Sequence, residues 1–299
     1  MITIFGSINL DLVVAVPRLP SAGETVAGPD HQTFPGGKGG NQALAARRAG
    51  AKVAMVGAVG KDAFAEPALE NLRNDGVDLS GVRTLDGTTG LAFIGIDPAG
   101  ENQIIEAKGA NARIDPEWLE TGLATSNMLM LQGDLPFESF SRALDFARQA
   151  GTSIFWNPAP VPEGSLFSCL DEVHTLVVNE TEAAEVARHL SLSGDPVTFV
   201  EQLTTPSRSV VVTLGAQGIV SGQGEQRLKL KAPEIQAADT TGAGDAFCGA
   251  MAAALDGGVN FERAVKEGMA AGALACTVTG AQSSVPFKND IAALADQIV

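Results

Sequence analysis

A turn of small residues that ends in one carboxylate is the part of this chain best suited to chemistry. Gly242, Ala243 and Gly244 lead into Asp245, and the Ala-rich segment 247–255 follows. Backbone N–H groups at a helix start are unpaired and attract an anion, and glycine leaves that end open. A base beside an anion site is what phosphoryl transfer to a hydroxyl requires. The same pattern is also typical of an ordinary glycine turn with an aspartate at a helix start.

A second glycine-rich segment, residues 36–42, precedes a good helix-forming stretch that stops at Gly50. Upstream, Asn9 and Asp11 follow the apolar run 2–5. We therefore expect them just beyond a strand's carboxyl end, where α/β sheets bind ligands. Residues two apart on an extended backbone face the same side, so this Asn and Asp could clamp vicinal hydroxyls.

The elements that position these residues alternate between apolar strands and helices. Strands are expected at 2–5, 53–56, 128–131, 153–156, 175–178 and 210–214. Helices are expected at 41–49, 63–74, 116–123, 137–149, 180–189, 246–255, 261–277 and 290–297. This alternation predicts an α/β fold with a doubly wound, mostly parallel sheet covered on both faces.

Two stretches break this alternation. Residues 12–34 are extended and contain several prolines, and residues 88–106 read as strand, turn, strand. We expect them to form a small β-sheet lid, and residues 1–11, 35–87 and 107–299 to form the main nucleotide- and substrate-binding domain.

Composition excludes some classes of protein. The 299 residues carry a net charge of −15, which disfavours nucleic acid and anionic membranes as partners. No signal-peptide pattern and no apolar run of membrane-spanning length is found. The three scattered cysteines fit reduced thiols in a cytoplasm, and the histidines show no zinc-type spacing with them. The P-loop, dinucleotide-binding and protein-kinase signatures are missing, which leaves the Gly242–Asp245 turn as the phosphate site.

Taken together, the motifs resemble those of the ribokinase-like, or PfkB-type, sugar kinase family. The matching segments occur in the family's order along essentially the whole chain: 6–9 with Asp11, 20–25, 36–42, 157–160, 179–182, 213–215, 239–247 and 280–286. The resemblance implies ATP-dependent phosphorylation of a sugar, with D-ribose as the favoured acceptor. It also implies a lid over the sugar whose sheet serves as a homodimer contact.

In this interpretation Asp245 is the base that accepts the proton of the primary hydroxyl as it attacks the γ-phosphate. Gly242, Ala243 and Gly244 form the anion hole. The sugar is bound by Asn9, Asp11, Asn41, Asp134 and Asp245, with Gly36, Gly37 and Lys38 as the close wall. A solvated surface lysine is the alternative for Lys38.

The ATP site is expected to use residues from several segments: Asn179, Thr213, Gly215, Gly218, Gly244, Met269 and Gly272. Asn179 and Glu182 resemble the family's Asn-x-x-Glu motif, which implies placement of Mg²⁺. Three-residue spacing puts both on one face of a helical turn, where they are also typical of a capping box. The two interpretations are compatible.

The resemblance further implies an activating K⁺ site. The matching positions are Asp239, Thr241, Ala275, Val278, Gly280 and Ser284, and carbonyl oxygens suit such a weakly hydrated ion. Asp239 and Ser284 are alternatively ordinary loop-capping residues.

Two departures leave the sugar open. Asp134 stands where ribokinases carry a sugar-contacting Glu, and Ala246 replaces a hydroxyl residue common after the catalytic Asp. Deoxyribose, fructose or a nucleoside remain alternative substrates, and a non-catalytic sugar sensor remains an alternative function. A nicotinamide oxidoreductase is opposed by the missing dinucleotide-binding signature. A nucleoside would need an aromatic pocket under the lid, for which Phe34 and Phe93 are the candidates.

Overall fold

The computed structural model describes residues 1–162 and 164–299. A nine-stranded sheet forms its centre, in the order β13-β12-β11-β10-β9-β8-β1-β4-β5. Its strands are β1 (Ile2–Phe5), β4 (Val53–Gly60), β5 (Asp78–Leu85), β8 (Met128–Gln132), β9 (Ser153–Asn157), β10 (Thr175–Asn179), β11 (Ser209–Thr213), β12 (Ile219–Gln223) and β13 (Gln226–Leu230). Strands β11 to β5 are parallel, and β12 and β13 form an antiparallel edge.

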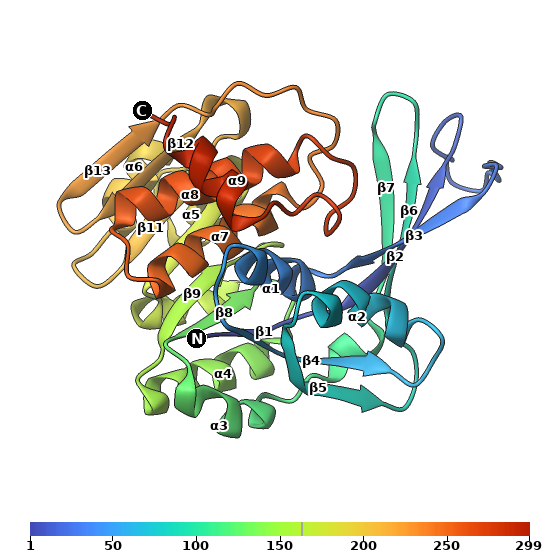
Figure 1. Ribbon diagram of the computed structural model, residues 1–299, viewed down its shortest axis with the longest axis horizontal. Helices are drawn as coiled ribbons and strands as arrows, with labels where there is room; N and C mark the ends of the chain where they lie inside the picture. Colours follow the sequence, from blue (N-terminus) through green and yellow to red (C-terminus); the bar gives the residue numbers. More distant parts are fainter. Residues whose placement is uncertain (163) are drawn as a thin grey trace.

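Helices cover both faces of this sheet, as the alternation predicted (Figure 1). Helices α1 (Lys38–Arg48), α2 (Ala65–Asn74), α7 (Ala243–Asp256), α8 (Phe261–Ala275) and α9 (Lys288–Ala295) pack on one face. Helices α3 (Leu119–Gly122), α4 (Phe137–Ala150), α5 (Glu180–Leu190) and α6 (Pro196–Leu203) pack on the other. Each face buries its own apolar core.

A second sheet of four strands, in the order β3-β2-β6-β7, contacts α1 and α2 at its base and projects from the main domain at its other end (Figure 1). It contains β2 (Asn9–Ala15), β3 (His31–Gly36), β6 (Gly90–Ile96) and β7 (Asn102–Ala107). The predicted strand, turn, strand motif is therefore present. We call this sheet the lid. Its strands begin at Asn9 and end at Ala107, so Asn9, Asp11 and Gly36 belong to the lid strands themselves.

Some expected elements differ from the structure. The helix expected at 116–123 is a 3₁₀ turn (Pro116–Trp118) followed by the single turn α3. Only five residues separate Pro116, which starts the segment, from Gly122, which disfavours helix, and this leaves little room for a regular α-helix. Strands β5, β12 and β13 were missed. β5 and β13 are edge strands with exposed polar side chains, and the buried β12 has only two apolar residues before Ser221 and Gly222. Further 3₁₀ turns lie at Gly109–Arg113, Leu123–Thr125, Gly164–Glu172 and Gly215–Gln217.

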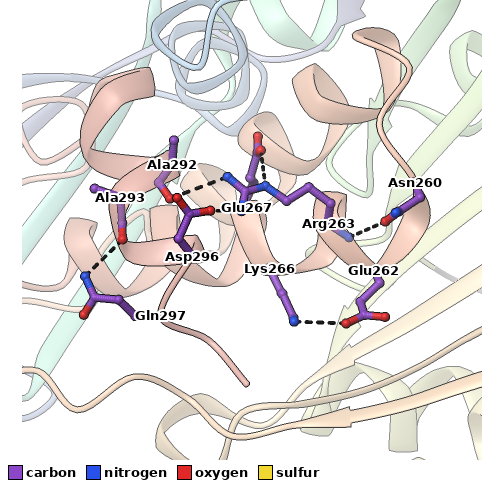
Figure 2. A network of polar contacts seen from close by, with 9 residues as sticks. All are labelled: Asn260, Glu262, Arg263, Lys266, Glu267, Ala292, Ala293, Asp296 and Gln297. Atoms are coloured by element: carbon purple, nitrogen blue, oxygen red, sulfur yellow. Dashed lines mark hydrogen bonds and ion pairs between the residues drawn. The ribbon is translucent and has the colours of Figure 1, made fainter.

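Outside the cores, a polar network ties α8 to α9 (Figure 2). The Arg263 guanidinium donates to the Glu267 carboxylate at 2.7 Å and to Asp296. Asn260 caps the start of α8 by accepting from the Arg263 N–H at 2.8 Å. The network secures helix α8 against α9.

Candidate active site

The predicted base Asp245 lies in the first turn of α7 and is only 7% exposed. Both of its carboxylate oxygens accept hydrogen bonds from α1. Asn41 Nδ2 donates to Oδ2 at 2.9 Å, and Gln42 Nε2 donates to Oδ1 at 3.0 Å. Two segments two hundred residues apart in sequence thus fix one rotamer of this carboxylate.

A buried chain of amides holds Gln42 in turn. Gln42 Nε2 also donates to Asn157 Oδ1 at 3.1 Å, and Gln42 Oε1 accepts from Gln132 Nε2 at 3.0 Å. Asn157 Nδ2 donates to the Val177 carbonyl at 2.9 Å. Because an amide has no proton to give up at neutral pH, this chain orients Asp245 without competing for its proton. Sequence reasoning gave none of these amides a role, although Gln42 and Asn157 lie inside quoted motifs.

The start of α1 forms a close wall beside this carboxylate. Gly37, the residue before the helix, has φ 83°, and a Cβ there would come within 2.7 Å of the Asn9 nitrogen. A Cβ on Gly36 would lie 2.5 Å from an Asp11 carboxylate oxygen. Gly37 therefore requires glycine, and a side chain on Gly36 would displace the Asp11 carboxylate. Lys38 follows, and the Asp245 carboxylate raises the pKa of Lys38 against the opposing effect of burial. It lines a cavity rather than facing bulk solvent.

The lid supplies a second group of polar side chains. Asn111, in the Gly109–Arg113 turn, donates from Nδ2 to Asn9 Oδ1 at 2.7 Å. Asn9 Nδ2 donates to Glu106 Oε1, on β7, at 3.3 Å. Burial, Glu106 and Asp245 together raise the pKa of Asp11 to about 6. Sequence reasoning missed both Asn111 and Glu106.

Phe93 was wrongly expected under the lid. It pairs with Leu12, one residue out of phase with Asp11, so it lies on the opposite face of the lid sheet and is 45% exposed. Phe34 pairs with Asp11 and lies on the cleft face. The cleft face therefore offers one aromatic ring rather than a pair.

Asn41 Oδ1 is buried beside this cleft and has no hydrogen-bond partner among the described residues. Ser7 Oγ and Asp134 Oδ1 are also buried there, and they have no partner apart from the contact between their own two side chains. Burial raises the pKa of Asp134, and the contact with the Ser7 side chain and the Lys38 charge act in the opposite direction. Unpartnered buried oxygens are unusual in a folded protein unless a ligand or water completes them. A polyhydroxylated ligand has the hydroxyl donors that these oxygens need.

A cavity of about 640 Å³ lies on the other side of the α7 start. It is lined by residues that include Thr213, Gly215, Gly218, Met269, Gly272 and Ala273. A Cβ on Gly244 would meet no atom within 4 Å, so this glycine borders open space. The volume suits a mononucleotide. The structure thus brings together the residues expected to bind ATP, except for Asn179.

Asn179 lines an adjoining cavity of about 210 Å³ with Lys38, Glu182 and Asp245. The two cavities share Thr213, Gly244 and Phe247. The capping box at α5 is present: Asn179 Oδ1 accepts from the Glu182 N–H, and Glu182 Oε2 accepts from the Asn179 N–H, both at 2.8 Å. Burial raises the pKa of Glu182. The capping box does not use Asn179 Nδ2 or Glu182 Oε1.

The glycine turn itself starts α7 with Gly242 in the left-handed region, at φ 76°. A Cβ there would come within 2.8 Å of Ala281, so only glycine fits. The Ala243 N–H donates to the Thr240 carbonyl at 3.2 Å. Of the three expected anion-binding groups, Ala243 is therefore partly engaged within the turn.

The six positions matched to a cation site lie on the loop before α7 and on the end of α8 with the loop that follows it. Asp239 Oδ1 accepts from the Thr241 N–H and hydroxyl, and Oδ2 accepts from the Gly280 N–H at 2.9 Å. Burial alone would raise the pKa of Asp239, but these hydrogen bonds outweigh it and lower the pKa. The Gly280 carbonyl accepts from the Ser284 N–H, and the Ala275 carbonyl from the Val278 N–H. An ionised carboxylate among carbonyls fits a hard monovalent cation.

Within residues 1–162 and 164–299, no group of three or more His, Cys, Asp and Glu side chains is placed to hold a metal ion. Across the same residues, no helix has the length and apolar character to cross a membrane.

Comparison with known proteins identifies the family. The model of the pfkB family carbohydrate kinases matches residues 1–288. The chain is 36% identical to the ribokinase of Lactococcus lactis, covering 98% of this chain and 96% of the relative. It is 32% identical to the deoxyribokinase of Salmonella typhimurium, covering 95% of each.

Solved structures agree. The ribokinase of Thermotoga maritima superimposes with a TM-score of 0.89 at 32% identity, covering 99% of both chains. The ribokinase of Arabidopsis thaliana, complexed with ribose and ATP, gives a TM-score of 0.85 at 29% identity, covering 98% of both chains. A buried carboxylate at a glycine turn, between a polar cleft and a nucleotide-sized cavity, is thus found in a chain that belongs to the pfkB family of carbohydrate kinases.

Proposed function

We propose that this chain transfers the γ-phosphate of ATP to the primary hydroxyl of D-ribose, giving ribose 5-phosphate and ADP. The observation that carries the proposal is the position of Asp245. Its carboxylate is fixed by Asn41 and Gln42 and lines the cavity that adjoins the nucleotide-sized one. The 34–36% identity to four ribokinases over nearly the full chain supports ribose as the acceptor.

In the proposed mechanism the sugar lies between the lid and the start of α1. Asn9, Asp11, Asn41 and Asp134 bind its hydroxyls. Asp245 accepts the proton of the primary hydroxyl while the oxygen attacks the γ-phosphate, which suits a loose transition state with late proton transfer. Gly242 and Gly244 direct N–H groups toward the developing charge, and Lys38 stands beside it.

Mg²⁺ is proposed to bind with ATP near Asn179 and Glu182, where it would neutralise phosphate charge. The fit rests on the donor set. Both side chains line the 210 Å³ cavity with Asp245, and carboxylate and amide oxygens are suitable Mg²⁺ ligands or water-binding groups. Their capping box fixes the two side chains in place before the metal binds.

K⁺ is proposed at the loops around Asp239, Thr241, Ala275, Val278, Gly280 and Ser284. Asp239 accepts hydrogen bonds from Thr241 and Gly280 and so connects the two loops. A cation bound there would hold these loops together and restrict the motion of the adjoining glycine turn. The three hydrogen bonds that Asp239 already accepts hold its carboxylate ionised, as a cation requires.

The lid is proposed to pair two copies of the chain. Phe93 and Ile105 pair on the face of the lid turned away from the cleft and are 45% and 72% exposed. Ile104, which is 56% exposed, lies on the cleft face. Apolar side chains gathered on an exposed sheet favour association. Light scattering after size exclusion should show a dimer, and Ile105→Glu should yield a monomer.

A cytoplasmic location is proposed from the few, scattered cysteines, and cell fractionation tests it.

An ADP-release assay with MgATP and a panel of pentoses, hexoses and nucleosides tests the function. Ribose should give the highest kcat/KM, and replacing K⁺ by a large inert cation should lower the rate. Preference for deoxyribose, the substrate named for the 32% identical relative, would refute ribose but not the chemistry. Sugar binding without turnover of any substrate would favour a sensor.

A further inference from the structure

Glu106 is a charged group of the cleft beneath the lid to which the sequence motifs assign no role. It lies on β7, and its carboxylate accepts a hydrogen bond from Asn9 Nδ2 at 3.3 Å. Asn9 and Asp11 are proposed sugar ligands, so Glu106 reaches the same site from a different strand.

The register of the lid shows how this carboxylate is aimed. Asp11 pairs with Ala92, and Ala92 pairs with Glu106. Paired residues project from the same face of a sheet, so all three side chains face the cleft. Glu106 and Asp11 stand two strands apart, which separates their Cα atoms by about 10 Å. The methyl group of Ala92 lies between them, and a sugar edge fits in that gap.

Electrostatics agree with this placement. Glu106 is one of the causes that raise the pKa of Asp11, which requires the two carboxylates to be near one another. Neither has a Lys, Arg or His partner within 4 Å among the described residues. An ionised carboxylate only accepts hydrogen bonds, so the pair calls for donors from the ligand.

The direction of the sugar follows from Asp245. With the primary hydroxyl at Asp245, the opposite end of the sugar faces the lid. That end carries the C1, C2 and C3 hydroxyls of a free pentose. A 2-deoxy sugar lacks one of these donors, and a nucleoside has a base in place of the C1 hydroxyl.

We infer that Glu106, with Asp11, forms a two-carboxylate clamp that selects free, fully hydroxylated sugars over deoxy sugars and nucleosides. This inference rests on the proposed function and names the acceptor class of that same site. Glu106 is a specificity-determining residue. Its carboxylate is exposed in this structure and accepts one hydrogen bond, from Asn9, so a bound sugar would displace water from it. A substrate without the matching hydroxyl would not replace the hydrogen bonds of that water, which costs affinity.

The experiment measures kcat and KM for ribose, 2-deoxyribose and 1-deoxyribose (1,4-anhydroribitol) with wild type, Glu106→Leu and Glu106→Gln. Wild type should prefer ribose over at least one deoxy form by tenfold or more. Glu106→Leu should raise KM for ribose at least tenfold and reduce that preference below threefold. Glu106→Gln keeps an acceptor oxygen and should retain most of the preference. Glu101→Gln, in the turn before β7, changes the charge equally and serves as the control.

A preference that is unchanged in Glu106→Leu, for both deoxy forms, would overturn the inference. Loss of folding is excluded by the melting temperature and by an unchanged KM for ATP. If wild type phosphorylates another sugar and not ribose, the proposed acceptor is wrong. The same comparison with that sugar and its deoxy forms then still tests Glu106.

Discussion

Replacing Asp245 by Asn removes the proposed base while keeping the shape of the side chain. In the wild type both Asn41 and Gln42 donate to the carboxylate, but the new amide has one oxygen that accepts and one NH₂ group that donates. One of the two neighbours must therefore accept instead. The side-chain amide of Gln42 cannot rotate by 180°, because its Nε2 donates to Asn157 and its Oε1 accepts from Gln132. Asn41 can, since its Oδ1 has no partner among the described residues. A flipped Asn41 would accept from the new amide, so we expect a loss of stability of only about 1 kcal/mol.

The catalytic loss should be much larger. A positioned base contributes about 10²–10⁴ in rate, which corresponds to about 3–5 kcal/mol of activation free energy. We therefore expect kcat in the ADP-release assay to fall at least a hundredfold in Asp245→Asn. Calorimetry should show ribose binding weakened less than tenfold, because Asn9, Asp11 and Asp134 are unchanged and both the new amide and the flipped Asn41 still offer hydrogen-bonding atoms.

Asp256→Asn is the matched control, with the same charge change at the far end of α7. It should keep the wild-type kcat. Turnover by Asp245→Asn within tenfold of wild type would refute the reasoning, because the carboxylate would then not be the base.

Three further predictions concern neighbouring features. Gly244→Ala places a methyl group in open space at a helix start, so the melting temperature should hold or rise while KM for ATP increases at least tenfold; an unchanged KM would mean that phosphate does not approach Gly244. The pKa of Asp11 is raised to about 6, so the folded state holds this proton more tightly than the unfolded chain, and ionisation destabilises the fold. In urea titrations, the unfolding free energy of wild type relative to Asp11→Asn should therefore fall by about 2–3 kcal/mol between pH 4 and pH 7, and a flat difference would contradict this. Arg263→Met breaks the network of Figure 2 and should cost about 1 kcal/mol of stability without changing kcat, whereas Arg73→Met, at a more exposed ion pair, should cost less; equal costs would show that the α8–α9 network adds nothing.

The buried parallel strands could be predicted from sequence because both of their faces are apolar. β10 and β11 appear as short apolar runs, and their carboxyl ends carry Asn179 and Thr213 as expected. The edge strands β5 and β13 could not, because half of their side chains face solvent and their patterns match those of loops.

The candidate site divides in the same way. Glycines at Gly37 and Gly242 could be found because their positive φ angles and close contacts permit no side chain. Gln132 carries no local pattern: it ends an apolar strand, and its bond to Gln42 joins residues 90 positions apart. Glu106 likewise reads as one polar residue in an exposed strand, and only the lid register brings it to Asp11.

The most direct test of the central claim is the structure of the product. Wild-type protein, MgATP and ¹³C-labelled ribose would be followed by ³¹P and ¹³C NMR. The account predicts one phosphate ester on C5, seen as phosphorus coupling to the C5 methylene, formed together with ADP and absent with Asp245→Asn. A phosphate on C1, C2 or C3, or release of inorganic phosphate alone, would contradict it.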